Sequence, residues 1–171
     1  MEALSHFSIP FKGLKDGIHR LVFEVEDSFF HYFSNDEIQS GHFQVVLHLD
    51  KRPSISILAF ELEGKCNVFC DRCLAPIHLP VRGQFQLLLK PGEPDDSTDE
   101  VMFIKPETSY LSLAQIIYEY IMLSIPMIKT YNCDLENPKP CDVSVLEKIK
   151  DKEEHNPSGT LWEGLSGFNL D

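Results

Sequence analysis

The chain has 171 residues, 43% of them hydrophobic, and a formal charge of −12 from 27 acidic and 15 basic side chains. This length and hydrophobic content suit one domain with a sizeable core, which excludes wholesale disorder. The acidic surplus excludes a general nucleic-acid coat, because such proteins normally carry excess basic charge to neutralise phosphates. Any RNA contact is therefore expected to be local, or to run through a basic partner that the acidic surface attracts.

No stretch of the chain predicts a membrane span or an export signal. The longest apolar run, 116–128, is interrupted by Glu119 and Pro126 and falls short of the roughly 20 residues that a bilayer span needs. The first residues are acidic at Glu2 and lack the apolar stretch of a signal peptide. We therefore expect a cytoplasmic protein whose five cysteines are reduced thiols or metal ligands.

Alternating apolar residues predict long strands in the first half of the chain, the period expected where one face of a sheet is buried. The clearest run places every second residue from Phe43 to Leu49 on one side. A capping box at 34–37 predicts a short helix that ends near Gly41. The expected strands cover 18–26, 42–50, 54–63 and 77–89. The last two flank a turn that contains Cys70, so they predict an antiparallel meander with that turn at its end.

The second half predicts one strong helix. Residues 111–124 carry an apolar stripe that includes Leu113, Ile117 and Leu123, which is typical of a helix packed on a sheet, and Pro126 ends it. The other expected elements are an acidic solvated loop over 91–100, a strand over 101–104 and a charged helical segment over 143–154.

Together these elements predict an α+β fold: a mainly antiparallel β-sheet, open or barrel-like, with the amphipathic helix at 111–124 packed on it. We expect a single domain over 1–155 that includes a cysteine knuckle at 70–73, and a flexible C-terminal tail over 156–171.

Two pairs of cysteines are the main candidates for chemistry. Cys70 and Cys73 form a C-x-x-C half-site, and Cys133 and Cys141 flank a Pro-rich loop about sixty residues later. Four thiolates of this kind suit a closed structural zinc site. Cys66 is a substitute ligand. The alternative is that these residues are small thiols packed in the interior, without a metal.

Redox or catalytic roles have less support. Oxidoreductase C-x-x-C pairs usually sit at a helix N-terminus, which lowers the thiol pKa, but Leu74-Ala75-Pro76 and a strand follow here. His78 is a weaker metal ligand candidate than the cysteines. The sequence has no Gly-rich phosphate loop, no G-x-S-x-G and no H-E-x-x-H. We therefore expect no catalytic residues and no cofactor besides the possible structural Zn²⁺.

A few basic residues are candidates for partner binding. Arg72 lies inside the cysteine turn, and Arg82 is on the polar side of the next strand, so the two form a possible local phosphate spot. Lys51, Arg52 and Lys90 are the other basic residues that qualify. The alternative for all five is ordinary surface charge that offsets nearby carboxylates.

The segment Cys70-Asp-Arg-Cys-Leu-Ala-Pro76 resembles the C-x-R-C-L-x-P core of the YceD family of large-ribosomal-subunit rRNA accumulation proteins. In that family a strand ending in Gly precedes the core, here 62–64, and a strand, an acidic loop and a helix follow it. The helix pattern matches from Leu113 to Pro126. The tail around Trp162 and Leu165 is similar to the family's closing motif, with stretched spacing and without its arginine. The resemblance covers about residues 15–165.

The resemblance implies a bacterial or organellar protein that supports normal levels of large-subunit rRNA. It does not imply a metal, since many members keep only part of the cysteine set. Our first hypothesis is a non-enzymatic assembly factor that binds a basic ribosomal protein or a pre-ribosomal particle. The second is a structural zinc module that binds another protein without a ribosomal role, and the third is a small thiol-dependent enzyme.

Overall fold

The computed structural model describes residues 2–33, 38, 40–98, 100–130, 132–133 and 136–155. The chain divides into two compact units, of which the first comprises 1–68 and 78–129 and the second 69–77 and 130–171. We call them the sheet unit and the cysteine unit. The strand β4 (Ser56–Phe69) begins in the sheet unit and β5 (Pro76–Pro91) ends there. The turn between them, with the last residue of β4 and the first two of β5, belongs to the cysteine unit. The expected tail over 156–171 lies outside the described residues.

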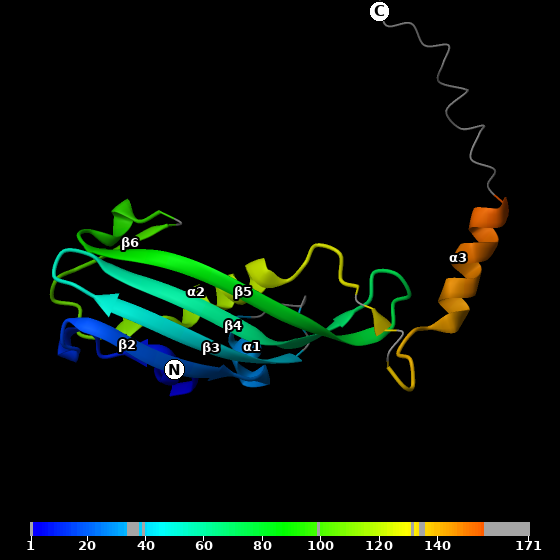
Figure 1. Ribbon diagram of the computed structural model, residues 1–171, viewed down its shortest axis with the longest axis horizontal. Coiled ribbons are helices and arrows are strands. Elements are labelled where there is room, and N and C mark those ends of the chain that lie inside the picture. Colours follow the sequence, from blue (N-terminus) through cyan, green and yellow to red (C-terminus); the bar gives the residue numbers. More distant parts are fainter. Residues whose placement is uncertain are drawn as a thin grey trace, which may run out of the picture. The chain divides into compact units, whose positions relative to one another are not determined.

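The sheet unit is built on a five-stranded sheet in the order β2-β3-β4-β5-β6 (Figure 1). The other strands of this sheet are β2 (Gly17–Val25), β3 (Ser40–Lys51) and β6 (Val101–Ile104). The pairs β2–β3 and β3–β4 are antiparallel, while β6 pairs with β5 in parallel at one edge. The predicted mainly antiparallel α+β fold is therefore confirmed, with a sheet that is open rather than closed into a barrel.

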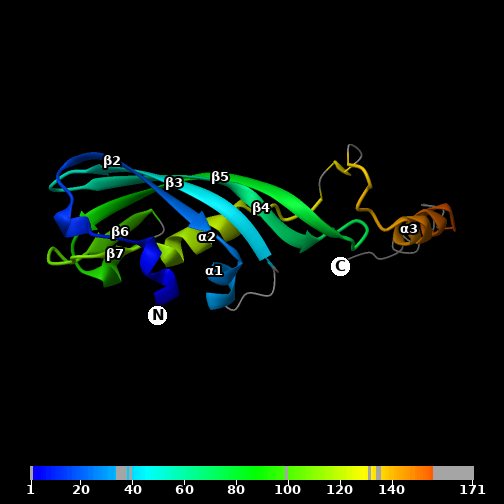
Figure 2. The same cartoon turned by 90° about the horizontal axis from the view of Figure 1, so that it is seen from below.

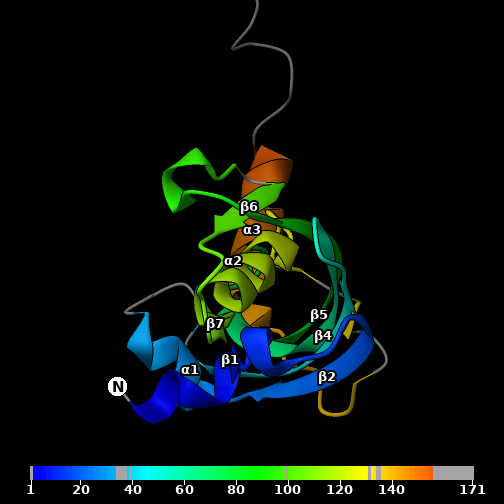
Figure 3. The same cartoon turned by 90° about the vertical axis from the view of Figure 1, so that its left-hand side faces the viewer.

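The core of the sheet unit lies on the concave face of the sheet. Alternate side chains of β3 and β4 are buried, with Phe43, Leu47 and Leu58 fully so. Figures 2 and 3 show the sheet curving around the helix α2 (Ala114–Ser124). Tyr120 of this helix stacks on Phe85 with ring centroids 4.3 Å apart and meets Phe60 edge-on at 5.2 Å.

Short elements cover the remaining edge of this core. The strand β1 (Ser8–Ile9) pairs with β7 (Leu111–Ser112) in a separate two-stranded sheet, and α1 (Asp27–Tyr32) packs its two phenylalanines inward. The 3-10 helices are η1 (Glu2–Phe7), η2 (Phe11–Gly13) and η3 (Pro94–Asp96). The helix α3 (Val143–His155) belongs to the cysteine unit. None of the helices in the described part of the chain is long and apolar enough to cross a bilayer.

Several predicted boundaries are wrong. The helix expected from 111 starts at Ala114, because Leu111 and Ser112 pair with β1 instead. Leu123 is 70% exposed, since the buried face of α2 runs through Ile117, Tyr120 and Ile121. The strand expected to end at 63 continues to Phe69. Its extension begins at Gly64, which pairs with Phe43 of β3.

The helix predicted from the capping box at 34–37 is wrong at its end. Ser40 and Gly41 belong to β3, and residues 34–37 lie outside the described residues. The structure has the short helix α1 earlier, over Asp27–Tyr32, where Asp27 accepts a 2.8 Å hydrogen bond from the backbone N–H of Gly41. This bond ties the start of α1 to the start of β3.

Candidate functional site

All four predicted metal ligands lie in the cysteine unit. Cys70 and Cys73 come from the turn between β4 and β5, and Cys133 and Cys141 come from the segment that precedes α3. Cys70, Cys73 and Cys133 are buried, Cys141 is half-buried, and all of them are free thiols. Residues that are distant in sequence are therefore brought into one small region.

The turn that carries the first pair is fixed by its own backbone. The N–H of Leu74 donates to the carbonyl of Cys70 at 2.8 Å, and the N–H of Cys70 donates to the carbonyl of Ala75 at 2.9 Å. Leu74 has φ of 59°, which is a left-handed conformation that a leucine adopts at a cost. This conformation reverses the chain directly after Cys73, so that the N–H of Ala75 reaches the Cys73 sulfur.

The sulfur atoms of the two pairs are in contact. Cys73 hydrogen-bonds to the side chains of Cys70 and Cys141, and the Sγ atoms of Cys141 and Cys133 are 2.9 Å apart. The four sulfurs thus form a continuous series, Cys70, Cys73, Cys141 and Cys133. The two cysteine pairs that the sequence separates by sixty residues meet through Cys73 and Cys141.

The surroundings favour the ionised form of one thiol. The backbone N–H of Ala75 donates to Cys73 and lowers its pKa, and the N–H of Asp142 and the Cys70 and Cys141 thiols act in the same direction against the effect of burial. The pKa of Cys141 is raised, chiefly by its hydrogen bond with Cys133. The pKa values of Cys73 and Cys141 are therefore shifted in opposite directions, and negative charge is favoured at Cys73.

Arg72 supplies positive charge to the same cluster. Its guanidinium donates to the Sγ of Cys141 at 3.7 Å, and this hydrogen bond raises the pKa of Arg72. The predicted partner-binding arginine is thus engaged by a cysteine of its own unit. Its positive charge offsets part of the negative charge that thiolates would bring.

The start of α3 holds Cys141 from the other side. Asp142 caps this helix: its Oδ1 accepts hydrogen bonds from the backbone N–H groups of Ser144 at 3.0 Å and Val145 at 3.3 Å, and from the Ser144 hydroxyl at 2.7 Å. The Ser144 hydroxyl is the main reason that the pKa of Asp142 is lowered. The cap fixes the residue that follows Cys141 and turns its N–H toward Cys73.

The four thiols are suitable donors for zinc, but the sulfur atoms of Cys133 and Cys141 lie closer together than zinc coordination requires. Two thiolates on one tetrahedral zinc, each about 2.3 Å from the metal, lie about 3.8 Å apart. The 2.9 Å between Cys133 and Cys141 is shorter than that, and it is longer than the roughly 2.05 Å of a disulfide. As the described side chains stand, no group of three or more His, Cys, Asp or Glu residues is arranged to hold a metal ion. Metal binding would require the cysteine side chains to rotate apart.

The substitute ligands lie in the sheet unit. Cys66 is near the end of β4 with no exposed surface, and this burial raises its pKa to about 11. Its environment therefore opposes the thiolate form that a metal needs. The Nδ1 of His78 is engaged by the side-chain oxygen of Asn67.

Arg82, the other predicted partner-binding residue, is on the exposed face of the sheet unit. Its Nη2 lies 2.6 Å and its Nε 3.1 Å from one carboxylate oxygen of Glu63, and both side chains are largely exposed. Arg72 and Arg82 thus belong to different units and each has a partner within its own unit. An exposed pair such as Arg82–Glu63 adds little stability, so Arg82 can exchange this partner for another anion.

Sequence reasoning missed three features of this site. It did not identify Asp142 as the N-cap of α3, although an Asp directly before a helical segment is a usual start signal. It did not assign the left-handed conformation to Leu74, because glycine or asparagine is the residue that normally marks it. The contact between Arg72 and Cys141 spans 69 residues, and no local pattern predicts it.

Comparison with known proteins gives one result. The model of a family described as large ribosomal RNA subunit accumulation protein YceD matches residues 58–169. The match starts in β4, includes both cysteine pairs and extends beyond α3. No curated protein and no solved structure is significantly similar to the chain.

Proposed function

Because the chain belongs to the YceD family of large ribosomal RNA subunit accumulation proteins, we propose that it is a non-enzymatic factor for assembly of the large ribosomal subunit. In this role it acts in the cytoplasm and binds a basic ribosomal protein or a pre-ribosomal particle, so that large-subunit rRNA accumulates. The observation that carries the proposal is the family match, which covers about two thirds of the chain and both cysteine pairs.

The charge of the chain supports a basic protein as the direct partner. With a formal charge of −12, the protein attracts basic ribosomal proteins over the range of a Debye length and repels bare phosphate backbones. Contact with RNA is then either local or mediated by that partner.

The cysteine unit is the part we assign to partner binding. Structural zinc, held by Cys70, Cys73, Cys133 and Cys141, would tie the β4–β5 turn to the segment before α3. Four thiolates and Zn²⁺ carry a net charge of −2, and Arg72 is already placed against one of the sulfurs. We propose that the zinc makes this region rigid enough to present Arg72 and its neighbours to the ribosomal partner.

The direct test is depletion of the protein in its host cell, followed by measurement of the ratio of large- to small-subunit rRNA. We expect the ratio to fall and the wild-type chain to restore it. Two variants then separate the parts of the proposal: Cys70→Ser with Cys73→Ser should fail to restore the ratio, and Arg72→Gln should restore it partly. Cys66→Ala, which removes a thiol outside the cysteine unit, serves as the matched control and should restore it fully.

An unchanged ratio after full depletion would contradict the ribosomal role. The second candidate would then lead: a structural zinc module that binds some other protein. The contacts among the four sulfurs support that candidate, because they bring four thiols together whether or not the protein has a ribosomal role. Zinc binding by a chain whose depletion leaves rRNA unchanged is the result that would select it.

A further inference from the structure

A basic pocket lies at the end of the sheet where β3 turns into β4. The register pairs Gly17 with Lys51 and Pro91 with Ile104, so the start of β2 and the ends of β3, β5 and β6 meet there. The ends of β3 and β5 carry Lys51 and Lys90, and Lys105 follows the end of β6. The topology of the sheet unit, rather than any sequence cluster, gathers these charges.

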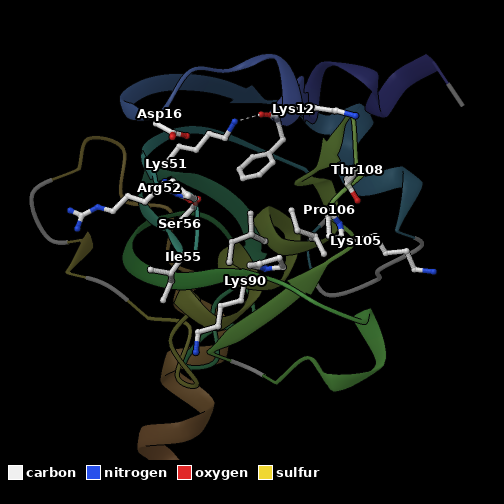
Figure 4. Close-up of a pocket in the computed structure, with 15 residues that line it drawn as sticks. Lys12, Asp16, Lys51, Arg52, Ile55, Ser56, Lys90, Lys105, Pro106 and Thr108 are labelled. Carbon is white, nitrogen blue, oxygen red and sulfur yellow. Dashed lines mark hydrogen bonds between the residues drawn. The ribbon is translucent and has the colours of Figure 1, made fainter.

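The pocket has an apolar centre and a cationic rim. Its volume is about 280 Å³, and Figure 4 shows the side chains that line it. Five lining residues are basic, a third of the 15 in the chain, and Asp16 is the only acidic residue among them. The apolar centre is formed by Phe11, Ile55, Leu89, Pro91, Ile104 and Pro106, and the basic residues are Lys12, Lys51, Arg52, Lys90 and Lys105.

Three of the five cations already have partners. The Nζ of Lys51 donates to the carbonyls of Phe11 at 2.9 Å and Leu14 at 2.6 Å, which makes it part of the wall. Arg52 pairs with Asp50, and Lys105 lies 3.6 Å from an exposed carboxylate of Glu93. The exposed pair of Lys105 and Glu93 can give up its carboxylate to a competing anion at little cost.

The side chains of Lys12 and Lys90 have no such partner. Within the described part of the chain, neither ammonium group has a hydrogen bond or an ion pair. They come from η2 and from the end of β5, and Figure 4 shows them on different sides of the apolar centre. The chain as a whole has a net charge of −12, but the two unpaired lysines give the surroundings of this apolar pocket local positive charge.

We propose that this pocket binds a nucleoside phosphate, with the base and sugar over the apolar centre and the phosphate at the lysine rim. Lysine binds phosphate as a point charge from several directions, whereas the planar fork of arginine suits bidentate recognition of a carboxylate or a phosphate. Here four of the five cations are lysines, and Asp50 already occupies the one arginine. A phosphate also carries more charge than a carboxylate, which suits a rim that holds several lysines.

The phosphate has two possible sources, a free nucleotide and one nucleotide of a single-stranded nucleic acid. A strand would place phosphates on both sides of the bound base, within reach of Lys12 and Lys90 separately. This proposal does not rest on the ribosomal role, because it uses only residues of the pocket.

The test is calorimetric titration of the full-length protein with AMP, adenosine and inorganic phosphate, and anisotropy titration with a labelled single-stranded oligonucleotide. We expect AMP to bind at least tenfold more tightly than adenosine or phosphate alone, because only AMP uses both the centre and the rim. Lys12→Gln with Lys90→Gln should weaken AMP and oligonucleotide at least tenfold. It should also lower the salt dependence of oligonucleotide binding by about one to two phosphate contacts.

The matched control is Lys148→Gln with Lys150→Gln, which makes the same charge change on α3 and should leave the binding unchanged. Equal affinities for AMP and oligonucleotide would support the proposal with a free nucleotide as the source, and a much tighter oligonucleotide would support it with a strand. An unaffected Lys12 and Lys90 variant would overturn the proposal. Binding of inorganic phosphate or a poly-glutamate peptide as tight as that of AMP would also overturn it.

Discussion

The two units bury different kinds of side chain. In the sheet unit the interior is aliphatic and aromatic, with residues such as Val25, Leu49 and Phe60 almost wholly excluded from solvent. In the described part of the cysteine unit five residues are buried, and three of them are Cys70, Cys73 and Cys133. A small region with so few apolar groups gains more from a crosslink or a metal than a large sheet with a packed helix does, and this is the role that we propose for zinc.

The same residue type behaves in opposite ways in the two units. In the apolar interior of β4, burial raises the pKa of Cys66 to about 11 and keeps its thiol protonated. In the turn, backbone and thiol hydrogen bonds lower the pKa of Cys73 although that side chain is also buried. A buried thiol with hydrogen-bond donors around its sulfur is therefore a better candidate ligand than one in an apolar interior.

The largest expected effect separates the two units by their dependence on zinc. Structural zinc sites in small domains contribute about 10–16 kcal/mol at neutral pH. Removing zinc with a chelator, or replacing Cys73 with Ser, should therefore unfold the cysteine unit and leave the sheet unit folded. Hydrogen exchange would then show lost protection at Leu74 and in α3, with protection retained in β3. Simultaneous loss in both units, or in neither, would contradict this division.

The reverse experiment destabilises the sheet unit alone. Phe60→Ala removes a ring that meets Tyr120 edge-on and is 1% exposed, so it should lower the free energy of unfolding of the sheet unit by about 3–5 kcal/mol. Chemical denaturation followed at β3 and β4 measures it, and zinc content should not change. Ile18→Ala, at a side chain that is 81% exposed, is the control and should stay within about 0.5 kcal/mol of the wild type.

The raised pKa of Cys66 predicts a loss of stability at alkaline pH. Between pH 9 and 11 the unfolded chain ionises this thiol and the folded chain does not, so stability that is present below pH 9 is lost as pH rises through that window. A shift of two pH units corresponds to about 2–3 kcal/mol. The measurement is the difference in unfolding free energy between wild type and Cys66→Ala at pH 9 and pH 11. A difference that is independent of pH would contradict the raised pKa.

The smallest effect concerns the turn. Leu74 has positive φ, which costs a leucine roughly 1–2 kcal/mol and a glycine almost nothing, so Leu74→Gly should stabilise the cysteine unit by about 0.5–1 kcal/mol after the entropy of glycine is counted. Competition with a chelator should show tighter zinc retention. Leu74→Ala keeps the strain and should show no gain; equal gains in both variants would mean that the conformation is not the cause.

The sequence predicted the parts of the fold that local periodicity controls. The alternation in β3 and β5 identified both strands within a few residues, because one face of each is buried. It failed where a distant partner decides: Leu111 and Ser112 are drawn into a strand by β1, and Gly64 continues a strand because Phe43 covers it. The sequence close to Leu111 or Gly64 does not predict these pairings, because the partner strands are distant in the chain.

The candidate sites show the same limit. The C-x-x-C spacing identified Cys70 and Cys73, and the second pair followed from counting cysteines, but the contact of Arg72 with Cys141 depends on how the unit folds. Of the basic pocket, the sequence singled out Lys51, Arg52 and Lys90 as isolated charges. Lys12 joins them only because the chain folds η2 against the end of the sheet.

The most direct test of this account is native mass spectrometry of the purified full-length protein, with a count of bound metal and of free thiols. We predict one zinc per chain with Cys66 as the only thiol that stays protonated and unligated. Loss of the metal in Cys73→Ser and its retention in Cys66→Ala would confirm the four-thiolate site. A metal-free chain with five free thiols, or with a disulfide between Cys133 and Cys141, would contradict it.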